Sequence, residues 1–237
     1  MTHDAPARST FRDRVRASVE PLALVFGRLG LTPNSLTLIG FVIAVVGAWL
    51  AATQSWLAAG LVVLFGAAFD MFDGALARAT NKASRLGAFM DSTFDRAGEA
   101  VVYVGIVAGL AKVPASVAAD APWLGLGPLL AAAAMAAAFM VSYARAKSEG
   151  LGFTAGRGMA SVGLAPREVR TAILGAGLIG AGIFNAQVAD FPAEVVPPPP
   201  VWWIVLAGSL GLIAILATFT VIQRIVHVVR EARRQEQ

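Results

Sequence analysis

Residues 70–95 read DMFDGALARATNKASRLGAFMDSTFD, and apolar sequence flanks this stretch on both sides. Asp70 and Asp73 are three positions apart, and Asp91 and Asp95 are four apart, so each pair lies on one face of its own helix. A charged side chain at membrane depth is costly, so a cluster of this kind indicates a functional site. If the two helices are neighbours, four carboxylates converge, and they cannot all stay ionised without cations between them.

The composition of the chain is that of a membrane protein. Of the 237 residues, 57% are hydrophobic and 14% are charged, and the mean hydropathy is +0.69. These values lie far from those of a soluble globular domain. The absence of cysteine excludes disulfides and thiolate metal sites. Residues 1–20 are polar and rich in arginine, unlike a secretory signal, and we expect them to belong to the mature protein.

Six apolar runs, each near the ~20 residues that a bilayer requires, predict an all-α integral membrane protein. They cover residues 35–52, 57–79, 85–111, 123–146, 170–188 and 201–227. We expect a cytoplasmic N-terminal segment over 1–34, a six-helix transmembrane catalytic domain over 35–227 and a basic cytoplasmic tail over 228–237. Between Phe11 and Gly30 apolar residues alternate with arginines, which indicates an amphipathic helix lying on the membrane surface.

Lysine and arginine gather on alternate loops of this predicted topology. They precede the first span, join spans two and three and spans four and five, and follow the last span, whereas the opposite loops carry only Lys112. The positive-inside rule therefore predicts a multi-pass protein of the plasma (inner) membrane, with both termini and the carboxylate cluster in the cytoplasm. The basic excess then reflects topology and attraction to anionic membrane lipid, and no nucleic-acid partner is expected.

The residue types in the carboxylate cluster favour a divalent cation. Hard oxygen ligands without histidine or cysteine nearby suit Mg²⁺, with Mn²⁺ or Ca²⁺ as substitutes. Gly74, directly after Asp73, would let a ligand approach the helix backbone closely, and Arg78 offers bidentate geometry for phosphate. Together they suggest a nucleotide diphosphate as ligand, with a carboxylate near the reacting hydroxyl as base.

The full pattern in this stretch is Asp70-x2-Asp73-Gly74-x2-Ala77-Arg78-x8-Gly87-x3-Asp91-x3-Asp95. It resembles the complete signature of the CDP-alcohol phosphatidyltransferases. The resemblance extends to the six spans, to the N-terminal amphipathic helix and to Leu-Thr-Pro-Asn34 at the start of the first span. It implies transfer of a phosphatidyl group, or an equivalent lipid phosphate, from a CDP-linked lipid to an alcohol, with release of CMP.

The same resemblance implies a role for each matching residue. Asp70, Asp73 and Asp91 would bind a pair of metal ions, and Asp95 would contact a metal and deprotonate the acceptor hydroxyl. The residues implied in holding the CDP moiety, or in giving it clearance, are Gly74, Ala77, Arg78, Gly87 and Asn34. The resemblance also implies direct displacement and a homodimer, although the residues alone leave a covalent intermediate open.

A basic loop between spans four and five bears on the acceptor. Tyr143-x-Arg-x-Lys-x-Glu-Gly-Leu-Gly resembles the family members that use inositol phosphate to make phosphatidylinositol phosphate or its archaeal-lipid counterpart. Those members often continue with Glu-Arg-x-x-Arg, where this chain has Pro166 in place of the glutamate but keeps both arginines. A phosphorylated acceptor such as inositol 1-phosphate would explain these cations. The candidate contacts to its phosphate are Arg145, Lys147, Arg167 and Arg170, with Arg157 and Glu149 as further possibilities.

Other interpretations remain open at this point. The positive-inside bias accounts for the charge of this loop equally well, and glycerol 3-phosphate, serine or inositol are alternative acceptors. The aspartates could merely pair with neighbouring cations, namely Arg78, Lys82, Arg85 and Arg96. A cation transporter with an acidic site is a different class, but such folds tend to show internal repeats and broken helices, and neither is visible here.

Overall fold

The structure is a computed structural model that describes residues 21–112, 122–153, 162–185 and 201–235. These residues form helices and turns, without a strand among them. The long helices, in chain order, are α2 (Pro33–Ala52), α3 (Trp56–Ala79), α4 (Arg85–Leu110), α6 (Leu126–Gly150), α7 (Arg167–Asn185) and α8 (Val201–Gln235), and a short 3₁₀ helix, η1 (Pro122–Gly125), precedes α6. The prediction of an all-α protein is thus confirmed over the described residues.

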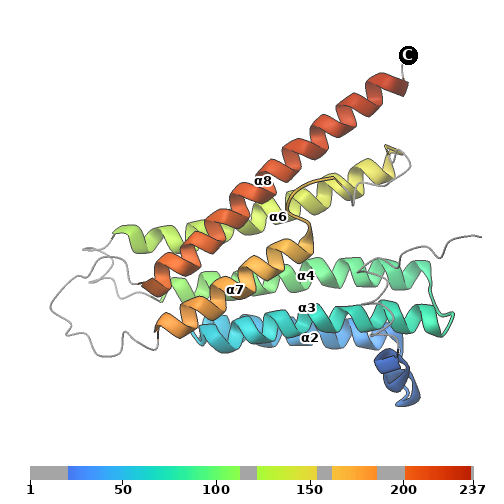
Figure 1. Ribbon diagram of the computed structural model, residues 1–237, viewed down its shortest axis with the longest axis horizontal. Helices are drawn as coiled ribbons and strands as arrows, with labels where there is room; N and C mark the ends of the chain where they lie inside the picture. Colours follow the sequence, from blue (N-terminus) through green and yellow to red (C-terminus); the bar gives the residue numbers. More distant parts are fainter. Residues whose placement is uncertain (1–20, 113–121, 154–161, 186–200, 236–237) are drawn as a thin grey trace, which may run out of the picture.

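The long helices form a closed ring in which each packs mainly against two others. The order around the ring is α2, α3, α7, α8, α6 and α4, which returns to α2. Figure 1 shows α2, α3 and α4 side by side, with α8 continuing beyond the bundle at its C-terminal end. The ring places the end of α3 and the beginnings of α4 and α7 around one region, although they are far apart in sequence.

Four segments are long and apolar enough to cross a membrane: Pro33–Ala52, Trp56–Ala79, Trp123–Gly150 and Val201–Gln235. The sequence predicts two further spans, and these correspond to α4 and α7. Both carry charged residues toward their N-terminal ends. They include Asp91, Asp95, Arg96 and Glu99 on α4, and Arg167, Glu168 and Arg170 in the first turn of α7. The described part of the structure therefore has four helices apolar enough to cross a membrane and two long helices that carry polar groups.

Small residues bring α2 and α4 into direct contact away from the carboxylate end. A Cβ atom on Gly105 would meet the carbonyl oxygen of Ala48, and one on Gly109 would meet that of Ala51. Such close backbone approach through glycine is typical of helix pairs in membranes. Because α4 is seated on α2 in this way, the side chains of its first turns face the beginning of α2.

The described part of the predicted amphipathic helix is residues 21–30, of which 21–28 are helical and 29–30 form a turn. Its aromatic residue Phe26 packs edge-on against Phe69 and Phe72 of α3, with ring centroids 5.9 and 5.3 Å apart. Leu22 and Val25 are exposed. The remainder of the predicted helix falls in residues 1–20, which lie outside the described residues. This segment therefore backs the turn of α3 that carries Asp70 and Asp73.

Candidate active site

All four predicted aspartates line one cavity of about 550 Å³. Asp70 and Asp73 come from the last turns of α3, and Asp91 and Asp95 from the first turns of α4. The other polar or small residues around the cavity include Gly74, Arg78, Arg167, Glu168 and Thr171. The convergence expected from the two spacings is therefore present, and the first turn of α7 forms a third wall.

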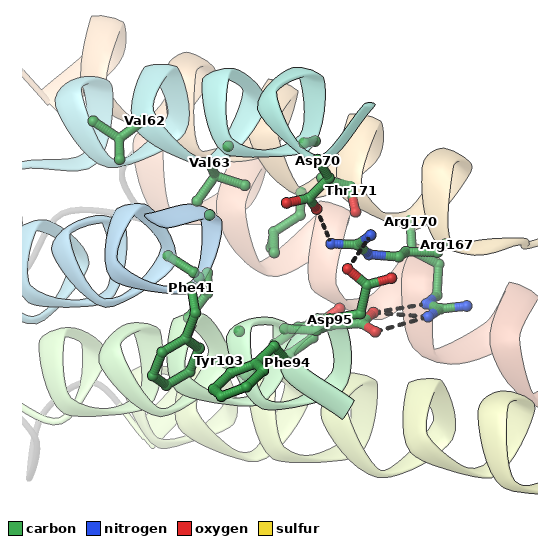
Figure 2. A pocket seen from close by; sticks show the side chains of 18 of the residues that line it. Phe41, Val62, Val63, Asp70, Phe94, Asp95, Tyr103, Arg167, Arg170 and Thr171 are labelled. Atoms are coloured by element: carbon green, nitrogen blue, oxygen red, sulfur yellow. Dashed lines mark hydrogen bonds and ion pairs between the residues drawn. The ribbon is translucent and has the colours of Figure 1, made fainter. Parts of the chain in front are cut away.

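A guanidinium group lies between two of the carboxylates. Arg167 donates to Asp70 Oδ2 at 2.5 Å and pairs with Asp95 Oδ1 at 2.7 Å (Figure 2). Asp70 and Asp95 belong to different helices, and all three side chains are only partly exposed. Arg167 thus supplies the cation that converging carboxylates require. Charge-assisted contacts of this length are among the stronger hydrogen bonds in proteins.

The other α3 aspartate is held from α2. Thr37 Oγ1 donates to Asp73 Oδ2 at 2.8 Å, and both residues are buried. Gly40, one turn further along α2, leaves room for the neighbouring carboxylate, because a Cβ there would lie 2.7 Å from Asp70 Oδ1. The first turns of α2 therefore orient both α3 carboxylates, one by a hydrogen bond and one by the absence of a side chain.

The neighbours of the two signature glycines, Gly74 and Gly87, show why a larger residue would be crowded at each position. A Cβ on Gly74 would lie 3.2 Å from Arg78 Nη1, so glycine leaves this guanidinium room one turn away on the cavity wall. A Cβ on Gly87 would lie 3.4 Å from Asn34 Oδ1, which brings the first turns of α4 and α2 together. Gly74 and Arg78 line the cavity with the aspartates, whereas Ala77, Gly87 and Asn34 are not among its lining residues.

The donor set fits a hard divalent cation by type, since four carboxylates share one cavity. Among the described residues, no three carboxylate or imidazole side chains are close enough to hold one ion together. In this arrangement Arg167 spans Asp70 and Asp95, and Thr37 holds Asp73. The residues that would hold a metal are the four aspartates, and a bound ion would compete with Arg167 for them.

Of the four predicted acceptor-phosphate contacts, Arg167 is the one that lines the aspartate cavity in the described part of the chain. Arg170 is buried, with 1% of its side chain exposed, and forms an ion pair with Glu99 at 2.8 Å. It lines a second, smaller cavity of about 60 Å³. The Asp70–Arg167–Asp95 bridge contributes to both cavities and so lies between them.

The remaining two candidates lie on the exposed C-terminal turns of α6. Arg145 pairs with Glu149 at 2.9 Å, four residues further along the helix. Lys147 is exposed on the same helix, and Arg157 falls outside the described residues. Neither Arg145 nor Lys147 lines the aspartate cavity, so their contact with an acceptor stays a prediction.

Several residues at or near the site were not singled out in the sequence analysis. Thr37, Gly40 and Glu99 contact their partners only through the packing of separate helices, and no spacing rule marks them. Arg224 of α8 is also buried, and donates to the carbonyl oxygen of Val141 on α6. A charged residue inside an apolar run was the available signal for Glu99 and Arg224.

The apolar ring and its polar cavity define an all-helical membrane protein whose cavity has the groups that bind cations and phosphate esters. The chain belongs to the CDP-alcohol phosphatidyltransferase family, whose sequence pattern it matches over residues 30–178. It is an enzyme of the class that transfers a lipid phosphate and releases CMP, and that uses divalent metal ions such as Mg²⁺ or Mn²⁺. This assignment decides against a cation transporter.

Relatives with curated names cover nearly the whole chain. The archaetidylinositol phosphate synthase of Pyrococcus horikoshii is 34% identical over 92% of this chain and 94% of its own length. The phosphatidylinositol phosphate synthase of Mycolicibacterium smegmatis is 33% identical over 89% of this chain and 82% of its own.

Solved structures of the phosphatidylinositol phosphate synthase of Mycobacterium tuberculosis share the fold. The structure with CDP-DAG bound gives a TM-score of 0.68 at 28% identity, and covers 89% of this chain and 92% of that one. The structure in complex with manganese and citrate gives a TM-score of 0.70 at 27% identity, over 89% and 88% of the two chains.

Two of the cavity aspartates do pair with cations in the described residues, but mainly with one other than the four neighbours named in the sequence analysis. That partner is Arg167, which the sequence analysis placed among the acceptor contacts. Within the described part of the chain, Arg96 is the one neighbouring cation of the four that forms an ion pair with an aspartate, at 3.8 Å from Asp95. Arg78, Lys82 and Arg85 make no ion pair within the described ranges, which leaves the Arg78 guanidinium available on the cavity wall.

Proposed function

We propose that this enzyme transfers the phosphatidyl group of CDP-diacylglycerol, or the lipid phosphate of an equivalent CDP-linked lipid, to a hydroxyl of inositol 1-phosphate. The observation that carries the proposal is the contact between Arg167 and Asp95, because it places a phosphate-binding guanidinium directly beside a candidate base. Inositol phosphate is favoured over unphosphorylated inositol, which carries no charge for such a cation to bind, and over serine, which carries no phosphate.

The chain's own residues have distinct roles in this proposal. Arg78, with clearance from Gly74, binds the diphosphate of the CDP-linked donor on the wall formed by α3. Arg167 turns from the aspartates to the phosphate of the acceptor. Asp95 takes the proton of the acceptor hydroxyl, whose oxygen forms a new bond to the lipid-side phosphorus. The bond between that phosphorus and the CMP oxygen breaks, and CMP leaves.

Asp70, Asp73, Asp91 and Asp95 would hold the divalent metal ions, which supply charge neutralisation for the pyrophosphate and for the departing CMP. The hydrogen bond from Thr37 and the space left by Gly40 keep the α3 carboxylates oriented toward the cavity. Arg167 gives these carboxylates a counter-charge, and metal ions held by the aspartates would take over that charge and free Arg167 for the acceptor phosphate.

The proposal includes a membrane topology. All six long helices would span the bilayer, with α4 and α7 burying their polar turns against each other inside the ring, and residues 1–34 would lie at the cytoplasmic surface. Both termini and the aspartate cavity would face the cytoplasm, as the lysine and arginine distribution indicates. The domain bounds 35–227 and 228–237, and the homodimer implied by the resemblance, stay predictions.

The test is CMP release by the purified protein with CDP-diacylglycerol and Mg²⁺. Inositol 1-phosphate, glycerol 3-phosphate, serine and inositol are offered in separate reactions, each with and without a chelator. We expect CMP release with inositol 1-phosphate and with none of the other three acceptors. Chelation should abolish this release, and excess Mg²⁺ or Mn²⁺ should restore it. Release with another acceptor alone would overturn the choice of acceptor while leaving the reaction class intact.

A further inference from the structure

Glu99 of α4 has no role in the reaction described so far, yet it is one of the most completely bonded side chains at the site. It is 7% exposed and accepts from Arg170 Nε at 3.0 Å and from Arg170 Nη2 at 2.8 and 2.9 Å. Arg96 Nη1 donates to Glu99 Oε2 at 2.8 Å. Arg170 donates in addition to the carbonyl oxygen of Ala165 at 2.9 Å. The Glu99–Arg170 pair is therefore a two-pronged, buried and fully satisfied contact.

This pair forms the deeper of two matching contacts between α4 and α7. Asp95 and Glu99 are one helical turn apart on α4, and Arg167 and Arg170 are one turn apart on α7. Asp95 meets Arg167 (Figure 2), and Glu99 meets Arg170. Since α7 packs mainly against α3 and α8, these ion pairs provide the polar link between α7 and α4.

The two contacts differ in how readily they can exchange. The Arg167 side chain is 27% exposed and lines the aspartate cavity, so a phosphate or a metal ion can compete for its contacts. Arg170 is 1% exposed, and its donors are already used by Glu99 and Ala165. Removing one partner of a buried pair leaves the other charge uncompensated, so this contact persists while the outer one changes partners.

We propose that Glu99 is a positioning residue for the acceptor: by holding Arg170, it keeps the first turn of α7 against α4, so that Arg167 stands beside Asp95. The inference rests on the proposed function, since it takes Arg167 as the contact to the acceptor phosphate. Glu99 itself does not line the aspartate cavity. Its effect on the reaction runs through Arg170 and the placement of α7, and a route through Arg96, which also bonds Glu99, is the alternative that the double-mutant cycle below tests.

The first test is the kinetics of Glu99→Gln, which keeps the shape of the side chain and removes its charge. We expect the acceptor KM to rise about tenfold or more, because a charge-assisted contact is lost, while the KM for the CDP-linked donor changes by less than about twofold. Glu99→Asp, which keeps the charge, should recover part of the loss. Equal rises in both KM values would overturn the proposal.

A double-mutant cycle tests the route of the effect. Arg170→Lys keeps the positive charge but loses the two-pronged geometry, and we expect it to raise the acceptor KM as Glu99→Gln does. If Glu99 acts only through Arg170, the double variant should be no worse than the more impaired single variant. Additive losses would show that Glu99 acts by another route. Glu231→Gln, which alters a carboxylate paired at 4.0 Å with Arg234 near the end of α8, is the matched control and should match the unaltered enzyme.

A measurement without turnover separates this inference from the proposed function. Because the chain has no cysteine, spin labels can be attached at Thr93→Cys on α4 and Val169→Cys on α7, both exposed positions. We expect the distance distribution between the labels to broaden or lengthen in Glu99→Gln, and to stay unchanged in Glu231→Gln. An unchanged distribution in Glu99→Gln would overturn the positioning role. Failure of inositol 1-phosphate as acceptor, with the distances changed as expected, would overturn only the proposed substrate.

Discussion

The Arg167 guanidinium lies 2.7 Å from the Asp95 carboxylate, so a cation suited to phosphate lies directly beside a candidate base in the cavity. The same side chain bonds Asp70 on the neighbouring helix at 2.5 Å. Four carboxylates in one cavity repel one another, and Arg167 offsets part of that repulsion. Arg167 is therefore affected by both kinds of ligand: metal ions would compete with it for the aspartates, and an acceptor phosphate would bind to it.

Asp95→Asn should abolish turnover while preserving binding of the CDP-linked lipid. The substitution removes the proposed base but leaves three of the four aspartates, and loss of a general base costs about 10²–10⁴-fold in rate. CMP release measures the first effect, and equilibrium binding of CDP-diacylglycerol in the presence of Mg²⁺ measures the second. Normal turnover by this variant would remove Asp95 from the mechanism.

Arg167→Ala and Arg78→Ala should affect opposite substrates. Arg167 lies beside Asp95, so its loss should raise the acceptor KM far more than the donor KM. Arg78 lines the α3 wall next to Gly74, so its loss should raise the donor KM instead, in each case by about tenfold or more for a lost charge-assisted contact. Initial rates with each substrate varied in turn give both values. The same pattern in the two variants would argue against separate donor and acceptor subsites.

Thr37→Val should weaken the response to the metal rather than the binding of either substrate. The hydroxyl donates to Asp73 at 2.8 Å, and valine keeps the side-chain shape without that donor. Loss of such an outer hydrogen bond costs about 10–100-fold in metal affinity, so a higher Mn²⁺ concentration should be needed for half-maximal rate. Thr37→Ser, which retains the hydroxyl, serves as the control. An unchanged Mn²⁺ requirement in Thr37→Val would show that this hydrogen bond does not orient Asp73 for the metal.

Gly40→Ala should disturb the neighbouring carboxylate directly. The added Cβ would lie 2.7 Å from Asp70 Oδ1, closer than real Cβ contacts allow, so the carboxylate must move. We expect a reduced rate and a raised Mn²⁺ requirement, by about tenfold as for other displaced metal-site groups. Gly208→Ala on α8, where an added Cβ meets nothing within 4 Å, is the matched control and should behave as the unaltered enzyme. Equal behaviour of the two variants would contradict the role given to Gly40.

Much of the helical framework could be predicted from the sequence, because long apolar runs leave few other structures open to a chain in a bilayer. The expected span over 57–79 corresponds to α3 (Trp56–Ala79), and that over 85–111 to α4 (Arg85–Leu110). The last helix is longer than expected, since α8 runs on to Gln235. The polar residues near its end favour helix as much as the apolar run does, and hydropathy detects only the membrane-spanning part.

Two arginines of α7 differ in the structure in a way that their spacing in the sequence does not predict. Arg167 and Arg170 are three positions apart and share one face of α7, so the sequence alone predicts the same role for both cations. In the structure Arg167 bonds two cavity aspartates, whereas Arg170 is buried against Glu99. Arg170 lies one helical turn deeper than Arg167, so its contact is buried while that of Arg167 can be exchanged. This depth depends on how α7 packs in the ring.

The sequence by itself determined the enzyme family, the helical class and the pairing of aspartates on two helix faces, because spacing along a helix decides which side chains share a face. Only the tertiary structure decided what those faces meet: Thr37 at Asp73, Gly40 at Asp70, and Arg167 between two helices. Arg167 and Asp70 are 97 positions apart, and no local rule relates residues at that separation. Their contact depends on the closed order of the ring, which arises from helix packing along the whole chain.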